Sequence, residues 1–419
     1  MATRDSAMTN TDVLNGCLVD FVPEKQFLFF APVSRSWRAA WGQRPTLTSC
    51  PTPDTSLSQL RCSFECGLPR DSLAMCDALA RDGKLEELQY ARQEGCPWDE
   101  EACSLAARGG RLLVLKWLRE NGCPWNGSTC SKAARGGHLD VLRWARQNDC
   151  PWGVTTCSDA ASGGYLGVLQ WARENGCPWD ASVSAAAARE GHLHVLQWAR
   201  QNGCPWNVFT CIFGAKGGHL NVLQWARENG CPWDKDTCWS AAEGGHLHVL
   251  QWARQNGCPW DAFTCAYAAG GGHLNVLQWA RENGCPWHSD TCAMAAKGGH
   301  LIVLQWARQN GCPWDNATCA MAASSGELAL LQWARNAGCP WNEDLCEIAA
   351  GRGHLAILQW ARQDGCPWNA GTCAAAASGG NLAALKWARE NGCPWSRADC
   401  LWLARNNGFD SVAAWIEEN

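Results

Sequence analysis

Cysteine is the residue whose number and spacing most strongly suggest chemistry in this sequence. The chain has 28 cysteines among 419 residues. Twelve of them precede Pro-Trp at a constant interval of 27 residues, at positions 96, 123, 150, 177, 204, 231, 258, 285, 312, 339, 366 and 393. Most are followed seven residues later by a second cysteine, as Cys96 is by Cys103.

Thiols at this spacing could bind zinc, form disulfides or pack as small apolar side chains. A separation of seven residues is not a zinc-knuckle pattern. Equivalent cysteines of adjacent repeats would lie ~8–10 Å apart, which is beyond disulfide reach. Ser184 also replaces one cysteine without changing the residues around it. We therefore expect reduced thiols packed inside the protein, with metal binding or redox chemistry as the alternative.

Histidine forms a second periodic row, in which each member follows a glycine. The row consists of His138, His192, His219, His246, His273, His300 and His354. A ladder of imidazoles could bind metal ions, but hydrogen-bonded histidines at a turn or near a helix N-cap are the expectation that we favour.

Arginine forms a third row, two residues after a repeated aromatic residue. Its members are Arg92, Arg119, Arg146, Arg173, Arg200, Arg227, Arg254, Arg281, Arg308, Arg335, Arg362 and Arg389. Cations at repeat spacing could follow the phosphates of RNA. However, glutamate alternates beside the row and the net charge is −5. We therefore expect the arginines to interact with helix C-terminal dipoles, and a nucleic-acid partner is unlikely on charge grounds.

The residues around these rows repeat with a period of 27, which is typical of stacked repeat proteins. The residue after each Pro-Trp is a preferred helix N-cap in most copies: Asp at 99, 180, 234, 261 and 315, Asn at 126, 207, 342 and 369, and Ser at 396. Gly153 and His288 are the exceptions. A first helix should therefore begin after this position in each repeat.

The glycines of the repeat predict where its two helices end. In the unit from Asp99 to Trp125, Gly109-Gly110 should end the first helix. A second helix should then bury Leu112, Val114, Leu115, Trp117 and Leu118. Two short helices cannot bury their apolar faces alone, so the repeats should stack, with the tryptophans inside the interfaces. The sequence predicts an all-α fold over residues 71–419, an α-solenoid of about 13 stacked antiparallel helix pairs.

The residues before the repeats differ in composition. Residues 1–11 are polar and should form a disordered tail, and apolar residues at helical spacing predict a small helical unit over 12–42. Residues 43–55 have the proline, serine and threonine content of a linker. Leu57 and Leu60 fall on two leucine positions of the repeat, so we interpret residues 56–70 as a degenerate half-repeat that caps the stack.

The repeat resembles the ankyrin repeat. Thr129-Cys130-Ser131-Lys132-Ala133-Ala134 matches the ankyrin T-P-L-H-x-A-A with Cys in place of Pro, and Gly137-His138-Leu139-Asp140-Val141-Leu142 matches G-H-L-E-V-V. The resemblance covers about residues 71–419 and implies a protein-binding repeat. These units are shorter than the 33-residue ankyrin repeat. The missing residues fall where ankyrin repeats have hairpin fingers, so the fingers should be reduced to tight loops.

The stretch from Leu18 to Arg38 is similar to the F-box pattern, because two apolar residues and a proline precede A-x-V-S-R-x-W-R. F-boxes dock on an adaptor subunit of a ubiquitin ligase and present a separate domain to the substrate. The resemblance implies adaptor binding through residues 12–41, by Leu14, Leu18, Phe21, Val22, Pro23, Val33 and Trp37. The Leu-Pro pair that usually opens the motif is absent, and Asp12-Val13-Leu14 stands near its place. The alternative is a helical cap on the repeats.

The sequence contains no nucleophile–base motif, phosphate loop or metalloprotease motif. We therefore expect a non-enzymatic protein without a cofactor. The first residues lack a signal peptide and no apolar run is long enough for a membrane span, so a cytoplasmic location is expected.

The leading hypothesis is a protein-interaction scaffold that binds where the copies differ. The expected contact residues are Phe209, Phe213, Lys216, Trp239, Glu243, Phe263, Tyr267, Met294 and Lys297, together with Val208, Ile212 and Met321. Ubiquitin-ligase recruitment is the alternative, followed by RNA binding.

Overall fold

A computed structural model describes residues 56–65, 70 and 73–419, and these residues form helices and connecting loops without a strand. The helices are α4 (Leu57–Glu65), α5 (Leu73–Asp82), α6 (Leu85–Gln93), α7 (Glu100–Arg108), α8 (Leu112–Glu120), α9 (Gly127–Arg135), α10 (Leu139–Gln147), α11 (Val154–Ser162), α12 (Leu166–Glu174), α13 (Ala181–Arg189), α14 (Leu193–Gln201), α15 (Val208–Lys216), α16 (Leu220–Glu228), α17 (Lys235–Glu243), α18 (Leu247–Gln255), α19 (Ala262–Gly270), α20 (Leu274–Glu282), α21 (Ser289–Lys297), α22 (Leu301–Gln309), α23 (Asn316–Ser325), α24 (Leu328–Asn336), α25 (Asp344–Gly351), α26 (Leu355–Gln363), α27 (Ala370–Ser378), α28 (Leu382–Glu390), α29 (Arg397–Asn406) and α30 (Asp410–Glu418).

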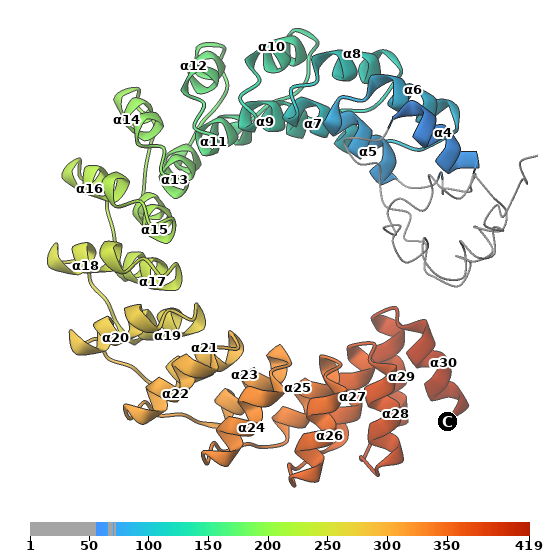
Figure 1. Ribbon diagram of the computed structural model, residues 1–419, viewed down its shortest axis with the longest axis vertical. Coiled ribbons are helices and arrows are strands. Elements are labelled where there is room, and N and C mark those ends of the chain that lie inside the picture. Colours follow the sequence, from blue (N-terminus) through green and yellow to red (C-terminus); the bar gives the residue numbers. More distant parts are fainter. Residues whose placement is uncertain (1–55, 66–69, 71–72) are drawn as a thin grey trace, which may run out of the picture. The chain divides into compact units, whose positions relative to one another are not determined.

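The described helices from α5 to α30 form thirteen pairs, as the repeat predicted. The first helix of a pair packs against the second, and it also packs against the first helix of the next repeat, as α7 does with α8 and α9. Figure 1 shows the first helices α15, α17, α19 and α21 in one row and the second helices α16, α18, α20 and α22 in another. The all-α solenoid of about 13 helix pairs is therefore confirmed.

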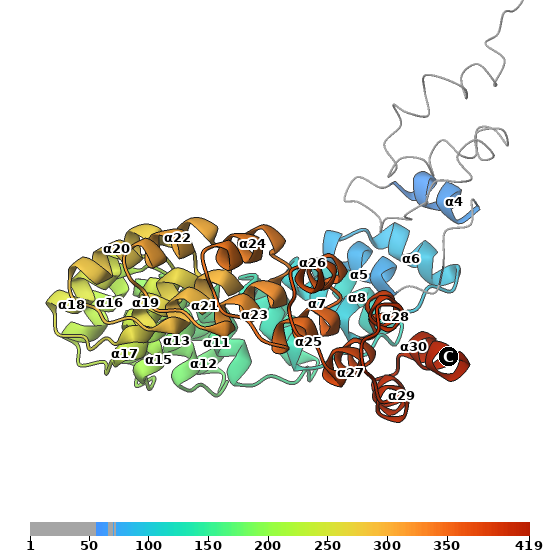
Figure 2. The ribbon, with the colours of Figure 1, turned by 90° about the horizontal axis from the view of Figure 1, so that it is seen from below.

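Contacts divide the chain into two units. The first unit consists of the residues up to Ala187 together with His194–Pro205. The second unit consists of Ala188–Leu193 and Trp206–Asn419. In the first unit, α5, α7, α9 and α11 follow one another in a row beside α6, α8, α10 and α12 (Figure 1). In the second unit, Figure 2 shows α20, α22 and α24 in a row above α19, α21 and α23. Each unit therefore has the same two-row construction.

The N-terminal predictions are only partly covered by the structure. The tail (1–11), the F-box-like segment (12–42) and the linker (43–55) lie outside the described residues. Helix α4 begins at Leu57 and packs against α6, with Leu60 and Phe64 buried. The interpretation of 56–70 as a half-repeat that caps the stack stays a prediction.

The helix N-caps follow the sequence with two differences. The Asp99 carboxylate accepts a hydrogen bond from the Glu101 backbone N–H at 2.8 Å, as expected for a capping residue. His288 also caps its helix, because its Nδ1 accepts from the Asp290 N–H at 3.2 Å. The prediction for Asn342 is wrong: α25 begins at Asp344, and the Asn342 amide instead donates to the Asp344 carboxylate at 2.8 Å.

The histidine row links consecutive repeats by hydrogen bonds. His138 Nε2 lies 3.0 Å from the carbonyl oxygen of Arg108, and His246 Nε2 lies 3.0 Å from that of Lys216. A carbonyl oxygen only accepts, so each Nε2 must donate. In the last full repeat, the Asn381 amide makes the same bond to Gly351 at 2.8 Å. The expected hydrogen-bonded histidine is confirmed, and its partner lies in the preceding repeat.

The histidine rings lie so close to some glycines that no other residue fits at those positions. Gly245 has a φ of +74°, and a Cβ on it would lie 2.5 Å from His273 Nδ1. Glycine is therefore required there both for its backbone conformation and for the close approach of the imidazole.

His246→Asn should reduce the loss of stability at acidic pH. Burial lowers the pKa of His246, as do the nearby His248, His219 and His273, against the effect of its bond to Lys216. The folded pKa lies below the unfolded value of about 6.5, so neutral His246 stabilises the fold above that pH, and this contribution is lost as the pH falls. The difference between the denaturant midpoints measured at pH 7.5 and at pH 5 should be smaller in the variant than in the wild-type protein.

At pH 7.5 the two proteins should have similar midpoints, because asparagine already makes this bond at position 381. An equal loss of stability in both proteins between pH 7.5 and pH 5 would show that His246 does not contribute to it.

Candidate functional site

The cysteines are packed inside the helix stack, as expected. All 24 cysteines in the described part of the chain for which side chains are placed are buried. The Cys123 thiol donates to the backbone carbonyl of Asp99 at 3.2 Å, and the Cys150 thiol donates to that of Asn126 at 3.5 Å. Each of these bonds joins the Cys-Pro-Trp turn to the N-cap of the repeat before it.

The structure pairs cysteines 20 residues apart, rather than the seven that stand out in the sequence. A hydrogen bond with Cys150, together with burial, raises the pKa of the Cys130 thiol above its ordinary range. Burial alone is the main reason that the pKa of Cys76 is raised to about 12. Ser184 keeps the arrangement, because its hydroxyl donates to Pro205 O at 2.9 Å and to the Cys204 sulfur at 3.6 Å. The same hydrogen bond lowers the pKa of Cys150, so each pair shares a proton-donating contact inside the core.

The tryptophans are less buried than predicted. Trp98 and Trp117 are only half-buried, and their rings meet edge to face with centroids 5.6 Å apart. The same contact joins Trp125 to Trp144 at 5.8 Å. These tryptophans border the surface between second helices, because the loop that contains Trp98 covers only one side of Trp117.

The arginines of the periodic row lie against these tryptophan rings. The Arg92 guanidinium carbon lies 3.9 Å from the Trp98 ring centroid, and its Nη1 donates to Cys96 O at 2.5 Å. Arg173 does the same with Trp179, at 4.2 Å, and with Cys177 O. The carbonyl lies just beyond the helix, so the arginine bonds to the turn after the helix and not to its last residues. These guanidinium groups already have partners within the chain, which weakens the argument that the arginine row binds RNA.

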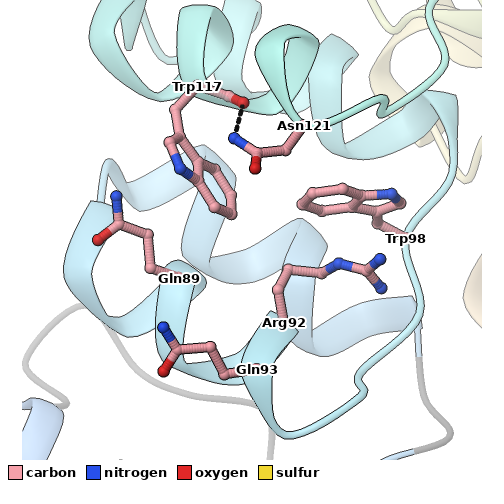
Figure 3. Close-up of a pocket in the computed structure, with 6 residues that line it drawn as sticks. All are labelled: Gln89, Arg92, Gln93, Trp98, Trp117 and Asn121. Carbon is pink, nitrogen blue, oxygen red and sulfur yellow. Dashed lines mark hydrogen bonds between the residues drawn. The ribbon is translucent and has the colours of Figure 1, made fainter.

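A groove opens between neighbouring second helices where these side chains meet. In Figure 3, Trp117, Gln89 and Trp98 face a common space, with Arg92 beneath the Trp98 ring. Its volume is about 380 Å³, within the range of ligand sites. A second groove of about 440 Å³ is bordered by the equivalent residues of a later repeat, Gln170, Arg173, Glu174, Trp179, Trp198 and Asn202. Neither groove was predicted from the sequence.

A different surface lies on the first helices α15, α17 and α19. Phe209 is 52% exposed and Phe263 is 41% exposed. The Phe209 ring lies 6.0 Å from that of Phe213. Trp239 contacts Phe263 at 5.3 Å and Tyr267 at 5.7 Å between ring centroids. We call these five residues the aromatic surface.

Charged side chains hold the aromatic surface in place. Asp261 caps α19, accepts a bond from the Trp239 indole at 2.7 Å and pairs with Lys235 at 3.0 Å. Lys216 pairs with Glu243 at 2.9 Å. One carboxylate thus fixes the orientation of Trp239, so the aromatic surface is organised before any partner binds.

The other predicted contact residues have mixed positions. Lys297 is exposed, whereas Met294, Val208 and Met321 are half-buried. Ile212 is buried, with 8% exposure, so its assignment to a contact surface is wrong. Trp402 was missed although it is 63% exposed. It occupies the same repeat position as Phe213 and Tyr267, and this register could have identified it.

Comparison with known proteins leaves the family open. No protein-family model and no curated protein matches the chain. Among solved structures, the human ASB11 ankyrin repeat domain has 18% identity and a TM-score of 0.32, covering 38% of this chain and 84% of that one. The pentatricopeptide repeat protein PPR10, in complex with an 18-nt psaJ RNA element, has 14% identity and a TM-score of 0.33, covering 99% and 73%. Likenesses at this level do not assign a function.

The described residues contain no cluster of three or more histidine, cysteine or acidic side chains arranged to hold a metal ion. None of the described helices is long and apolar enough to span a membrane.

Burial of the thiols predicts their reactivity. In the native protein, at most about four of the 28 thiols should react rapidly with a chromogenic disulfide reagent, because the 24 described ones are buried. All 28 should react after unfolding in guanidinium chloride. Rapid native reaction of ten or more thiols, counted by absorbance, would contradict this packing.

Proposed function

We propose that this protein is a non-catalytic interaction scaffold that binds a protein partner through the aromatic surface. The observation that carries the proposal is the group of five aromatic side chains on the first helices, of which Phe209 and Phe263 are exposed and the other three are half-buried. Aromatic residues are the commonest energetic anchors of protein interfaces. Phe209 and Phe263 expose large apolar areas that a partner would remove from water.

The charge around the aromatic surface indicates which partner segment would fit. Lys216 and Lys235 are paired within the chain. Partial burial, with the carboxylates of Asp234 and Asp261, raises the pKa of Asp236. A cation on the partner would relieve this repulsion. The favoured partner segment therefore combines an apolar side chain with a lysine or arginine.

The resemblance to ankyrin repeats supports the same class of function. The matched residues Thr129–Ala134 lie on α9, and Gly137–Leu142 lead into α10. The turn from Cys123 to Asn126 is short and has no hairpin. In this proposal the first helices, and not projecting fingers, contact the partner.

Phe209→Ala and Phe263→Ala should each weaken partner binding by at least about tenfold, since loss of an aromatic anchor costs about 1.4 kcal/mol or more. The partners would be identified by affinity purification with mass spectrometry and the affinities measured by titration. Leu113→Ala is the matched control, because Leu113 is 73% exposed on α8, outside the aromatic surface. Unchanged binding in both phenylalanine variants would exclude this surface.

We propose, as a second candidate function, recruitment of substrates to a ubiquitin ligase. The specific observation is the F-box-like pattern from Leu18 to Arg38. In this hypothesis residues 12–41 bind the ligase adaptor, and the repeats bind the substrate.

Full-length protein should capture the ligase adaptor in a pull-down, and deletion of residues 12–41 should abolish that capture. Phe209→Ala should retain adaptor binding while losing the partner of the repeats. The F-box-like hypothesis fails if the full-length chain does not capture the adaptor.

A further inference from the structure

Cys130 and Cys150 are brought together by the fold although they lie 20 residues apart in the sequence. Cys130 belongs to α9, and Cys150 lies in the turn that follows α10. The Cys130 sulfur is 3.9 Å from the carbonyl oxygen of Cys150, and the two thiols share a hydrogen bond. A disulfide requires two cysteine side chains that meet in this way. This pair therefore differs from equivalent cysteines of adjacent repeats, for which the repeat spacing argues against a disulfide.

The two thiols of this pair differ in their acidity. The hydrogen bond from Cys130 lowers the pKa of the Cys150 thiol, and the guanidinium groups of Arg146 and Arg119 lower it further, against the effect of burial. The same hydrogen bond, together with burial, raises the pKa of Cys130. The thiolate is the form that attacks a disulfide. Cys150 is therefore the expected nucleophile of the pair, and Cys130 supplies the second sulfur.

The position of Cys150 in a short surface turn gives its sulfur a route to solvent. The Cys150 side chain is buried, but both of its neighbours, Asp149 and Pro151, are exposed. Cys130 lies within α9, which is packed between α7 and α11. A local displacement of the turn would thus expose the Cys150 sulfur, whereas exposure of Cys130 requires separation of helices.

Asp149 strains the turn that holds Cys150. Its φ is +60°, and in the part of the chain that the structure describes it is the one residue other than glycine with a positive φ. The neighbouring repeats have Gly122 and Gly176 at this position, each with a φ of +81°. The left-handed region is unfavourable for a residue with a Cβ atom. The turn at Cys150 should therefore open more readily than the turns that follow these two glycines.

We propose that Cys130 and Cys150 form a redox-responsive dithiol, which a low-molecular-weight disulfide oxidises to an intramolecular disulfide. The Cys150 thiolate attacks one sulfur of glutathione disulfide, forms a mixed disulfide and releases one glutathione thiolate. Cys130 then gives its proton to solvent, attacks the Cys150 sulfur and displaces the second glutathione. The two protein thiols lose two electrons and two protons, and one glutathione disulfide becomes two molecules of glutathione.

The new bond ties α9 to the turn after α10. The site shares no residue with the aromatic surface, so it does not depend on the function proposed above.

Oxidation of the full-length protein by glutathione disulfide tests this proposal. Free thiols are blocked with N-ethylmaleimide at successive times, and disulfide-linked peptides are quantified by mass spectrometry without reduction. The Cys130–Cys150 disulfide should form about fivefold or more faster than disulfides in the hydrogen-bonded pairs of the neighbouring repeats, because strain at one residue is sufficient for such a factor. Those pairs are Cys103–Cys123 and Cys157–Cys177. Equal rates at the three pairs, or no Cys130–Cys150 disulfide, would overturn the proposal.

Asp149→Gly restores the residue of the neighbouring repeats and should slow oxidation of the Cys130–Cys150 pair by about fivefold or more. Asp149→Asn is the matched control, because it removes the charge but keeps a side chain in the left-handed conformation, and it should retain fast oxidation. Fast oxidation in the glycine variant, or oxidation of the asparagine variant as slow as that of the glycine variant, would contradict the role of strain.

Cys130→Ser should trap the mixed disulfide on Cys150, because no second thiol displaces the glutathione. Serine is accommodated at this position of the repeat, as Ser184 shows beside Cys204. Mass spectrometry should therefore find glutathione on Cys150 in this variant, whereas Cys150→Ser should leave Cys130 unmodified over the same time. Glutathione on Cys130 in the second variant, with none on Cys150 in the first, would refute the assigned order of attack.

Discussion

The Gly-Cys-Pro-Trp turn is the connection on which the rest of the stack depends. In most repeats a buried cysteine thiol bonds to an N-cap carbonyl of the preceding repeat, as Cys123 does with Asp99. The arginine of the preceding helix bonds to the cysteine carbonyl and covers the tryptophan, as Arg92 does with Cys96 and Trp98. A cation–π contact of this kind contributes ~0.5–2 kcal/mol. Stability should therefore be spread over many similar interfaces between neighbours.

This construction separates the frame from the surfaces that remain for partners. The cysteines are buried and the histidines bond to carbonyls of the preceding repeat, as His246 does. The arginines lie on tryptophan rings. The three periodic rows that most suggested chemistry in the sequence thus stabilise the stack. The exposed aromatic side chains, such as Phe209, and the open indole faces beside Gln89 remain available.

Local rules were sufficient to predict most of the fold from the sequence. The period, the capping residues and the glycines predicted thirteen helix pairs and most N-caps, because these depend on residues close in the chain. Trp117 was expected to be buried and is half-buried, because its exposure depends on how the loop that contains Trp98 covers it. The cysteine pairs were missed for the same reason, since Cys130 meets Cys150 only after stacking. Ile212 and Phe209 lie three residues apart in the sequence, and only the packed structure shows which of them faces the core.

The two surfaces vary along the stack in different ways. The second-helix surface keeps its tryptophans and arginines, but the position of Gln89 holds Lys116 and Arg143 in the next two repeats. The aromatic surface differs from repeat to repeat, since Phe209 is replaced by Asp236 in the next repeat and by Phe263 in the one after. A ligand displaced by one repeat there would place an apolar side chain against a carboxylate, at a cost in desolvation. The irregular first-helix surface therefore fixes one register for a bound partner.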